Sequence, residues 1–268
     1  MPFRGAHWYL LLLVPLIGLA FWPGYFAAFS SAPRELHIHG ATASLWIALL
    51  VTQSWSIHHR RAALHRAIGA SSFVLFPLFV MGGVLVIRSM AVKYTSGLDP
   101  FYAVNGPQLA AIDTLATVSI LILVHQAMRY RRDVHRHAAA MLGTVLFLLG
   151  PILARFLAFL PPFAITGPED FAGFGVNVHL SHLIGAGVAV AMAVRHPRSR
   201  QPLLILAGLV LLQSLAFELG RTAAWRQLVS AIADVPPMLL ASAGFGLGLA
   251  ALWTGWRMVP PRRPPMVA

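Results

Sequence analysis

Residues 129–160 read RYRRDVHRHAAAMLGTVLFLLGPILARFLAFL, a short basic run followed by a long apolar one. Roughly 20 apolar residues are enough for an α-helix to cross the hydrocarbon core of a bilayer. The run from 138 to 160 has that length and contains a single charged side chain, Arg155. This stretch predicts a transmembrane helix with a basic entrance, and the same pattern recurs along the chain.

The composition agrees with a chain that lies in lipid. Of its 268 residues, 58% are hydrophobic and only 10% are charged, and the mean hydropathy is +0.73. We therefore expect one integral membrane domain over residues 1–268, folded as an all-α bundle of about eight helices, with seven possible. The helices are expected near 8–29, 38–58, 67–87, 108–128, 138–160, 176–194, 203–219 and 236–256.

Arginine is concentrated in alternate connections between these helices, at 58–66, 129–137, 195–200 and in the C-terminal tail. Cytoplasmic loops carry the excess of Lys and Arg in membrane proteins. The sequence thus predicts a protein of the bacterial inner membrane with these loops and both termini in the cytoplasm, and an even helix count favours eight. The net charge of +12 then sets orientation, and no recognition motif for nucleic acid accompanies it.

Several kinds of chemistry are excluded by residues that the chain lacks. It has no cysteine, which rules out thiolate catalysis, iron–sulfur clusters and covalently attached haem. Lys93 is its only lysine and lies in an expected loop, so a buried retinal Schiff base is excluded. The motifs HExxH, GxxxxGK[ST] and GxSxG are absent as well. A metal or haem would have to rely on His, Met, Tyr or carboxylate ligands.

Two ionisable residues fall inside expected helices. Asp113 and Arg155 each lie about five residues from the outer end of a helix, which is roughly 7 to 8 Å deep. Such residues are costly in a membrane and mark functional sites unless they pair with a partner. The pair is open to two interpretations, a structural ion pair between neighbouring helices or part of a functional site.

Histidines near the expected outer face form a second candidate feature. His179 and His182 are three residues apart, so on a helix they share one face and could both reach a metal or a haem. His39, at the outer mouth of the second helix, lies at the same depth and completes the candidate metal set. His39, Trp46 and Gln53 recur every seven residues, which predicts a stripe that faces protein and not lipid.

The cytoplasmic side offers a second pair of imidazoles, His65 and His125. A haem b needs two imidazoles from facing helices at matched depth, with arginines nearby for its propionates. Both faces of the membrane contain the residue types for such a set. The remaining histidines in basic turns are expected to be solvated or to touch lipid headgroups.

The segments HIHGATASLWIALLVTQSW at 37–55 and LHRAIG at 64–69 resemble an uncharacterised family of bacterial multi-pass membrane proteins with the order HxHG, W, Q and HRxxG. The likeness continues through DPFYA at 99–103 and ITGPEDF at 165–171 to VNVHLSH at 176–182.

Residues 39–69 also look like a hairpin of di-haem cytochromes b. That resemblance implies His39 and His65 as axial ligands of an outer and an inner haem b, with partners from His179 or His182 and from His125. No second hairpin repeats the spacing, and Asp113 stands near the place of an outer histidine.

Three functions follow from these features. In the first, the protein binds haem b or another His-ligated metal and transfers electrons, from a quinol or another redox partner, with Asp113 and Arg155 tuning the charge. In the second, it is a small-molecule or proton-coupled transporter with a polar cavity around Asp113 and Arg155, and Pro77 and Pro151 break helices. In the third, it is a non-catalytic assembly or sensor protein.

Overall fold

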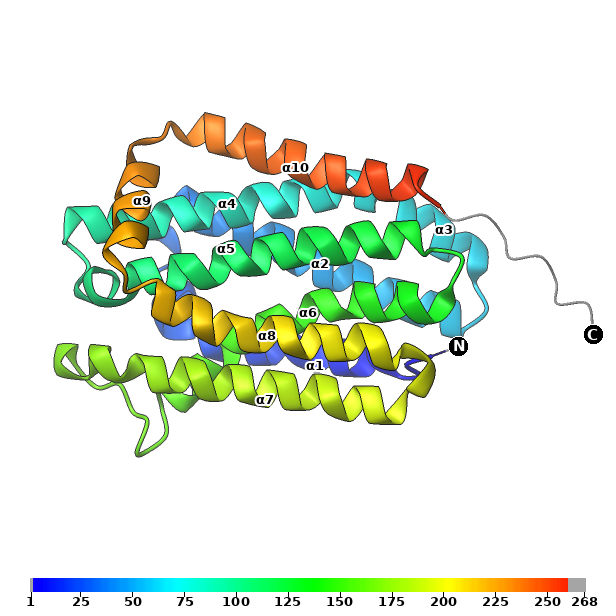
Figure 1. Ribbon diagram of the computed structural model, residues 1–268, viewed down its shortest axis with the longest axis horizontal. Helices are drawn as coiled ribbons and strands as arrows, with labels where there is room; N and C mark the ends of the chain where they lie inside the picture. Colours follow the sequence, from blue (N-terminus) through cyan, green and yellow to red (C-terminus); the bar gives the residue numbers. More distant parts are fainter. Residues whose placement is uncertain (1, 260–268) are drawn as a thin grey trace, which may run out of the picture.

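The computed structural model describes residues 2–259, which form helices joined by short connections and contain no strand. Eight long helices lie side by side, and successive ones run in opposite directions (Figure 1). The expected all-α bundle is confirmed. Its long helices are α1 (Ala6–Phe21), α2 (Arg34–His58), α4 (Ser72–Ser96), α5 (Pro100–Arg129), α6 (Val134–Leu157), α7 (Phe174–Arg195), α8 (Arg200–Leu219) and α10 (Pro237–Arg257).

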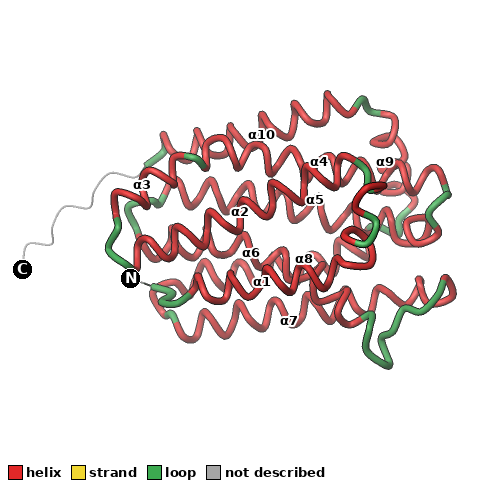
Figure 2. The backbone as a smooth tube through the Cα atoms, turned by 180° about the vertical axis from the view of Figure 1, so that it is seen from behind, coloured by secondary structure: helices red, strands yellow, loops and turns green. Residues whose placement is uncertain are grey.

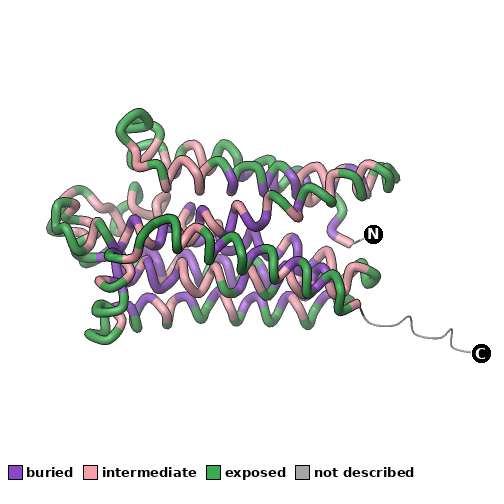
Figure 3. Tube along the Cα trace, turned by 90° about the horizontal axis from the view of Figure 1, so that it is seen from above, coloured by how far each residue is buried: buried purple, intermediate pink, exposed green. Residues whose placement is uncertain are grey.

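Seven of the long helices are both long enough and apolar enough to cross a membrane. The eighth, α2, is equally long but carries polar residues along its length, among them His39 and Gln53. One side of α2 packs against α1, α4 and α6, and the other side, where Leu45 is 56% exposed, faces outward. Buried residues line the inner faces of the helices and exposed apolar residues cover the outer faces (Figure 3). This is the architecture of a multi-pass membrane protein.

Short helices and turns gather at the two ends of the bundle (Figure 2). One end holds the turns at 59–61, 130–133 and 196–199 together with both described ends of the chain, and we call it the arginine-rich end. The opposite end, here the far end, holds the connections at 158–173 and 220–236. The arginine-rich connections therefore lie together, as the sequence predicts. The short elements are α3 (Ala62–Ala70), α9 (Ala223–Asp234) and η1 to η4 (Trp22–Phe26, Phe29–Ser31, Pro168–Gly173 and Pro197–Ser199).

Some boundaries differ from those expected. The third helix, placed at 67–87, is in fact two: α3 ends at Ala70, and α4 runs from Ser72 through Pro77 to Ser96. The fourth, placed at 108–128, begins at Pro100, because Asp99 caps it by accepting a hydrogen bond from the Tyr102 N–H. Hydropathy misses residues 100–107 because two prolines, Asn105 and Gly106 interrupt the apolar run there. Neither Pro77 nor Pro151 breaks its helix.

Glycines let α10 approach its neighbours closely. A Cβ atom at Gly248 would lie 2.7 Å from Cα of Pro77 in α4. A Cβ atom at Gly244 would lie 3.0 Å from Cα of Met81, and one at Gly255 would meet the backbone of His125 in α5. Close backbone contact through small residues is a common way to join helices in lipid. These glycines hold α10 to the bundle.

We expect Gly248→Ala to destabilise the bundle and the matched variant Gly246→Ala to leave it intact. The new methyl group at 248 meets α4 backbone, which cannot move aside as a flexible side chain can, whereas a Cβ atom at 246 has no atom within 4 Å. Overpacking of this kind costs about 1–3 kcal/mol. Thermal unfolding of both variants in the same detergent measures the effect, and equal melting temperatures would contradict this packing.

Candidate functional site

Trp46 in the middle of α2 joins three helices. Its indole Nε1 donates a hydrogen bond to Oγ1 of Thr144 in α6 at 3.0 Å. Its ring stacks on Phe79 of α4 with centroids 5.9 Å apart, and the side chain is only 1% exposed. A buried indole needs a partner for its N–H, and Thr144 supplies it. The prediction that the stripe of His39, Trp46 and Gln53 faces protein is confirmed.

Gln53, near the arginine-rich end of α2, is bound to His65 of α3 by two reciprocal hydrogen bonds. The Gln53 amide donates to the His65 carbonyl at 3.0 Å, and Nδ1 of His65 donates to the Gln53 carbonyl at 3.3 Å. These bonds fold α3 back against α2. Gln53 and His65, from the Q and HRxxG segments of the sequence pattern, thus join α2 to α3. We call this pair of hydrogen bonds the clasp, and His65 positions the turn between the two helices.

His39 lies at the far end of α2, inside its contact with α4. Its imidazole stacks on Phe79 with centroids 5.9 Å apart. A Cβ atom at Gly82 would lie 3.0 Å from Cα of His39, so the two backbones meet. The Nδ1 atom of His39 is buried and has no hydrogen-bond partner among residues 2–259. An imidazole nitrogen in this state is open to a proton, a water molecule or a ligand.

Asp113 on α5 and Arg155 on α6 lie in the far-end half of the bundle and make few contacts. The Arg155 guanidinium donates to the Pro151 carbonyl of its own helix at 2.9 Å and lies 4.2 Å from the centre of the Phe21 ring of α1. Within the described chain, the Asp113 carboxylate forms no hydrogen bond and no ion pair at 4 Å or less. The two side chains are therefore not joined by the direct ion pair that the sequence allows.

His179 and His182 share one face of α7, as their spacing predicts, and both contact α8. His179 donates from Nε2 to Glu218 at 3.0 Å, and Glu218 also binds Arg221 at 3.1 Å. His182 is 2% exposed, with Nδ1 3.1 Å from Oγ of Ser214. A Cβ atom at Gly150 of α6 would lie 3.2 Å from its Nε2. Both histidines thus have structural partners.

The candidate metal set of His39, His179 and His182 is not brought together. Helices α2 and α7 lie in different layers of the bundle, with α6 and α1 between them in both Figures 1 and 2. No group of three or more His, Asp or Glu side chains within residues 2–259 is placed to hold a metal ion. The depth of these histidines is shared, but their positions around the bundle are not.

The cytoplasmic pair expected for an inner haem b is separated in the same way. Nδ1 of His125 donates towards α10, to the Ala251 carbonyl at 3.3 Å, and lies 3.2 Å from Oγ1 of Thr254. His65, in contrast, is bound to Gln53 of α2. An axial pair requires two imidazoles that face one another. The contacts of His65 and His125 point to different neighbours and do not fit a haem between them.

Arg88 near the end of α4 is a residue that the sequence did not single out. It donates from Nε to the Val235 carbonyl at 2.8 Å and from Nη2 to the Ala233 carbonyl at 3.3 Å. Cations favour the negative end of a helix, and Arg88 here satisfies the C-terminus of α9. In the sequence, Arg88 is only an arginine just beyond an expected membrane span, a position where a basic residue needs no functional explanation.

The clasp between α2 and α3 makes a pH-dependent contribution to stability. Burial lowers the pKa of His65, the hydrogen bond to Gln53 opposes that effect, and Arg66 lowers the pKa further. The unfolded chain takes up a proton at His65 near its usual pKa of about 6.5, before the folded chain does. The contribution of His65 to the free energy of unfolding is therefore complete above that pH and is lost as the pH falls below it.

We therefore expect His65→Gln to reduce the loss of thermal stability between pH 7.5 and pH 5.5, because Gln cannot take up a proton. His59→Gln, at an exposed histidine of the same end, is the matched control and should behave as the wild type. Melting temperatures of the three proteins at both pH values measure the difference. An unchanged pH dependence in His65→Gln would show that this group does not contribute.

The far-end half of the bundle thus contains a carboxylate, a guanidinium and an imidazole nitrogen, from α5, α6 and α2, that form no hydrogen bond with a side chain of residues 2–259. Such groups can bind a polar solute or exchange protons. We call Asp113, Arg155 and His39 the far-end polar group. The chain matches no protein-family model, no curated protein and no solved structure.

Proposed function

We propose that this integral membrane protein is a transporter of small polar solutes, with a solvated cavity around the far-end polar group. The observation that supports the proposal most is that Asp113 lies within a spanning helix and its carboxylate has no hydrogen bond or ion pair from residues 2–259. An ionisable side chain in a membrane faces a partner, a water-filled space or a bound ligand. For the Asp113 carboxylate, no side chain of residues 2–259 lies within hydrogen-bond or ion-pair distance.

Arg155 complements this carboxylate. Its guanidinium has five N–H groups, and the contacts within the described chain are one backbone carbonyl and one aromatic ring. The remaining donors can bind an anionic or carbonyl-bearing solute, since a guanidinium binds carboxylate and phosphate well. Asp113 and His39 then supply groups that take up and release a proton, so that solute binding and proton movement are coupled.

A binding screen tests this proposal. Acetate, succinate, inorganic phosphate and ethanolamine are added to the purified protein, and thermal unfolding is followed. A solute that binds the folded protein at 100 times its dissociation constant stabilises it by about 2.7 kcal/mol. We expect at least one of these solutes to raise the melting temperature of the wild type but not of Asp113→Asn or Arg155→Gln.

Two exposed residues of the far end provide matched controls, Asp234→Asn and Arg226→Gln. These variants lose the same charges outside the far-end polar group and should keep the wild-type response. A response that survives in both Asp113→Asn and Arg155→Gln, or a panel without any effect on the wild type, would contradict a transport site at these residues.

Binding of haem b or of a single metal ion is the second candidate, and one observation favours it. The Nδ1 atom of His39 is buried without a partner, which is how a ligand nitrogen would look without its metal. An absorption spectrum and a metal analysis of the purified protein distinguish the two. A reducible Soret band that is lost in His39→Ala, or a stoichiometric metal, would support electron transfer and contradict transport.

We also propose that the protein resides in the bacterial inner membrane with its arginine-rich end in the cytoplasm. Because the chain has no cysteine, single cysteines report the orientation without further changes. In intact spheroplasts, a membrane-impermeant maleimide should label Thr166→Cys at the far end and leave Arg132→Cys unlabelled. The reverse result would contradict this orientation and would place the far-end polar group on the cytoplasmic side.

A further inference from the structure

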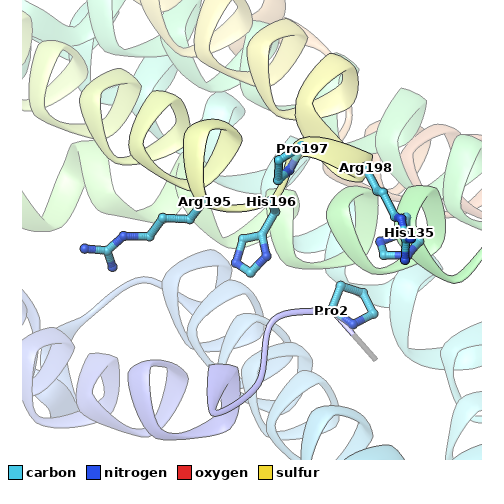
Figure 4. Close-up of a pocket in the computed structure, with 6 residues that line it drawn as sticks. All are labelled: Pro2, His135, Arg195, His196, Pro197 and Arg198. Carbon is cyan, nitrogen blue, oxygen red and sulfur yellow. The ribbon is translucent and has the colours of Figure 1, made fainter.

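At the arginine-rich end, a hollow of about 410 Å³ lies between the turn joining α7 to α8, the start of α6 and the N-terminal segment. Figure 4 shows the residues that line it: Pro2, His135, Arg195, His196, Pro197 and Arg198. The set contains two arginines, two histidines and no acidic residue. In the figure, His196 and Arg198 lie opposite Pro2, and Arg195 extends away from them.

The walls of this hollow are held in place by specific contacts. The ring of Phe3, which is 5% exposed, packs against His196 with centroids 4.4 Å apart. Ser199 is fully buried, and its hydroxyl donates to the His135 carbonyl at 3.3 Å. The N-terminal segment, the α7–α8 turn and the start of α6 are thereby fastened together. The hollow is a built feature and not a gap between independent loops.

Many arginines at this end already have partners in the protein. Arg131 donates to the Trp256 carbonyl and lies over its ring, Arg136 pairs with Asp133, and Arg61 lies over Trp55. Arg195 and Arg198 have no hydrogen bond, ion pair or aromatic contact within residues 2–259. Two cations border one hollow with no ion-pair partner among residues 2–259, so an anion in the hollow is attracted by both.

The surroundings indicate which anion this is. The hollow lies at the end of spanning helices, where lipid headgroups lie. Val194, at the end of α7, is 72% exposed, and Leu204, in the first turns of α8, is 43% exposed. These apolar side chains are placed to touch acyl chains below the headgroup. The N-terminus of α8 directly follows the lining residues and adds a further attraction for an anion.

We propose that this hollow, which we call the basic pocket, binds the phosphate of an anionic phospholipid headgroup. Arg198 binds the phosphate oxygens, Arg195 adds positive charge at the rim, and His135 and His196 line the space for the rest of the headgroup. Basic pockets between membrane helices are known to bind such lipids. The bound lipid joins the N-terminus, α6, α7 and α8 at one point and is separate from the far-end polar group.

The test is the retention of lipid by purified protein, measured by native mass spectrometry after incubation with equal amounts of phosphatidylglycerol and phosphatidylcholine. We expect the wild type to retain phosphatidylglycerol preferentially, and Arg195→Gln/Arg198→Gln to retain it about tenfold less, which corresponds to about 1.4 kcal/mol. Arg195→Lys/Arg198→Lys keeps both charges and should lose much less, which separates charge from misfolding.

Arg60→Gln/Arg132→Gln removes two exposed charges from the same end, outside the pocket, and should retain phosphatidylglycerol within about twofold of the wild type because its pocket charges remain. Equal losses in both Gln double variants would overturn the proposal in favour of a diffuse basic surface. A second experiment adds inorganic phosphate to the protein with bound phosphatidylglycerol. If millimolar phosphate displaced phosphatidylglycerol and raised the melting temperature as much as the lipid does, the pocket would bind free phosphate and the lipid assignment would be wrong.

Discussion

The structure depends on one constraint: in the interior of a bilayer no water is available, so a polar group must find its partner inside the bundle. Helix α2 meets this constraint most visibly. It is the long helix that falls short of the apolar character of the other seven, and it turns Trp46 and Gln53 towards its neighbours. Its polar side chains are matched by Thr144 of α6 and by α3. The helices around it can then present apolar faces to lipid.

The same constraint makes the unmatched groups informative. Trp46, Gln53 and Arg88 each have specific partners and are explained as structure. Asp113 and one nitrogen of His39 have none within residues 2–259. Other buried polar atoms, among them Gln108 Oε1 and Ser119 Oγ on the same helix as Asp113, also lack a partner within residues 2–259, but an ionisable group without a partner is the costlier case in a membrane. The Asp113 carboxylate inside the spanning helix α5 is therefore what supports solute or proton binding.

The sequence predicts the spans well and the site less well, for a physical reason. Length and hydropathy place α7 and α10 within about two residues, because the thickness of a bilayer sets both. The short helices α3 and α9 are missed, since they lie at the ends of the bundle and are not apolar throughout. Sequence position gives the depth of a residue in the membrane but not its position around the bundle. His39, His179 and His182 therefore share a depth while α2 and α7 remain apart.

The central claim is that Asp113 faces a solvated cavity that opens at the far end. The most direct measurement is the reaction of Asp113→Cys with a charged, membrane-impermeant methanethiosulfonate added from that side. This account predicts that the cysteine reacts, and that Val118→Cys, on the lipid-facing side of the same helix and 46% exposed, does not. An unreactive Asp113→Cys in vesicles where Thr166→Cys reacts fully would contradict the cavity and leave Asp113 enclosed by protein.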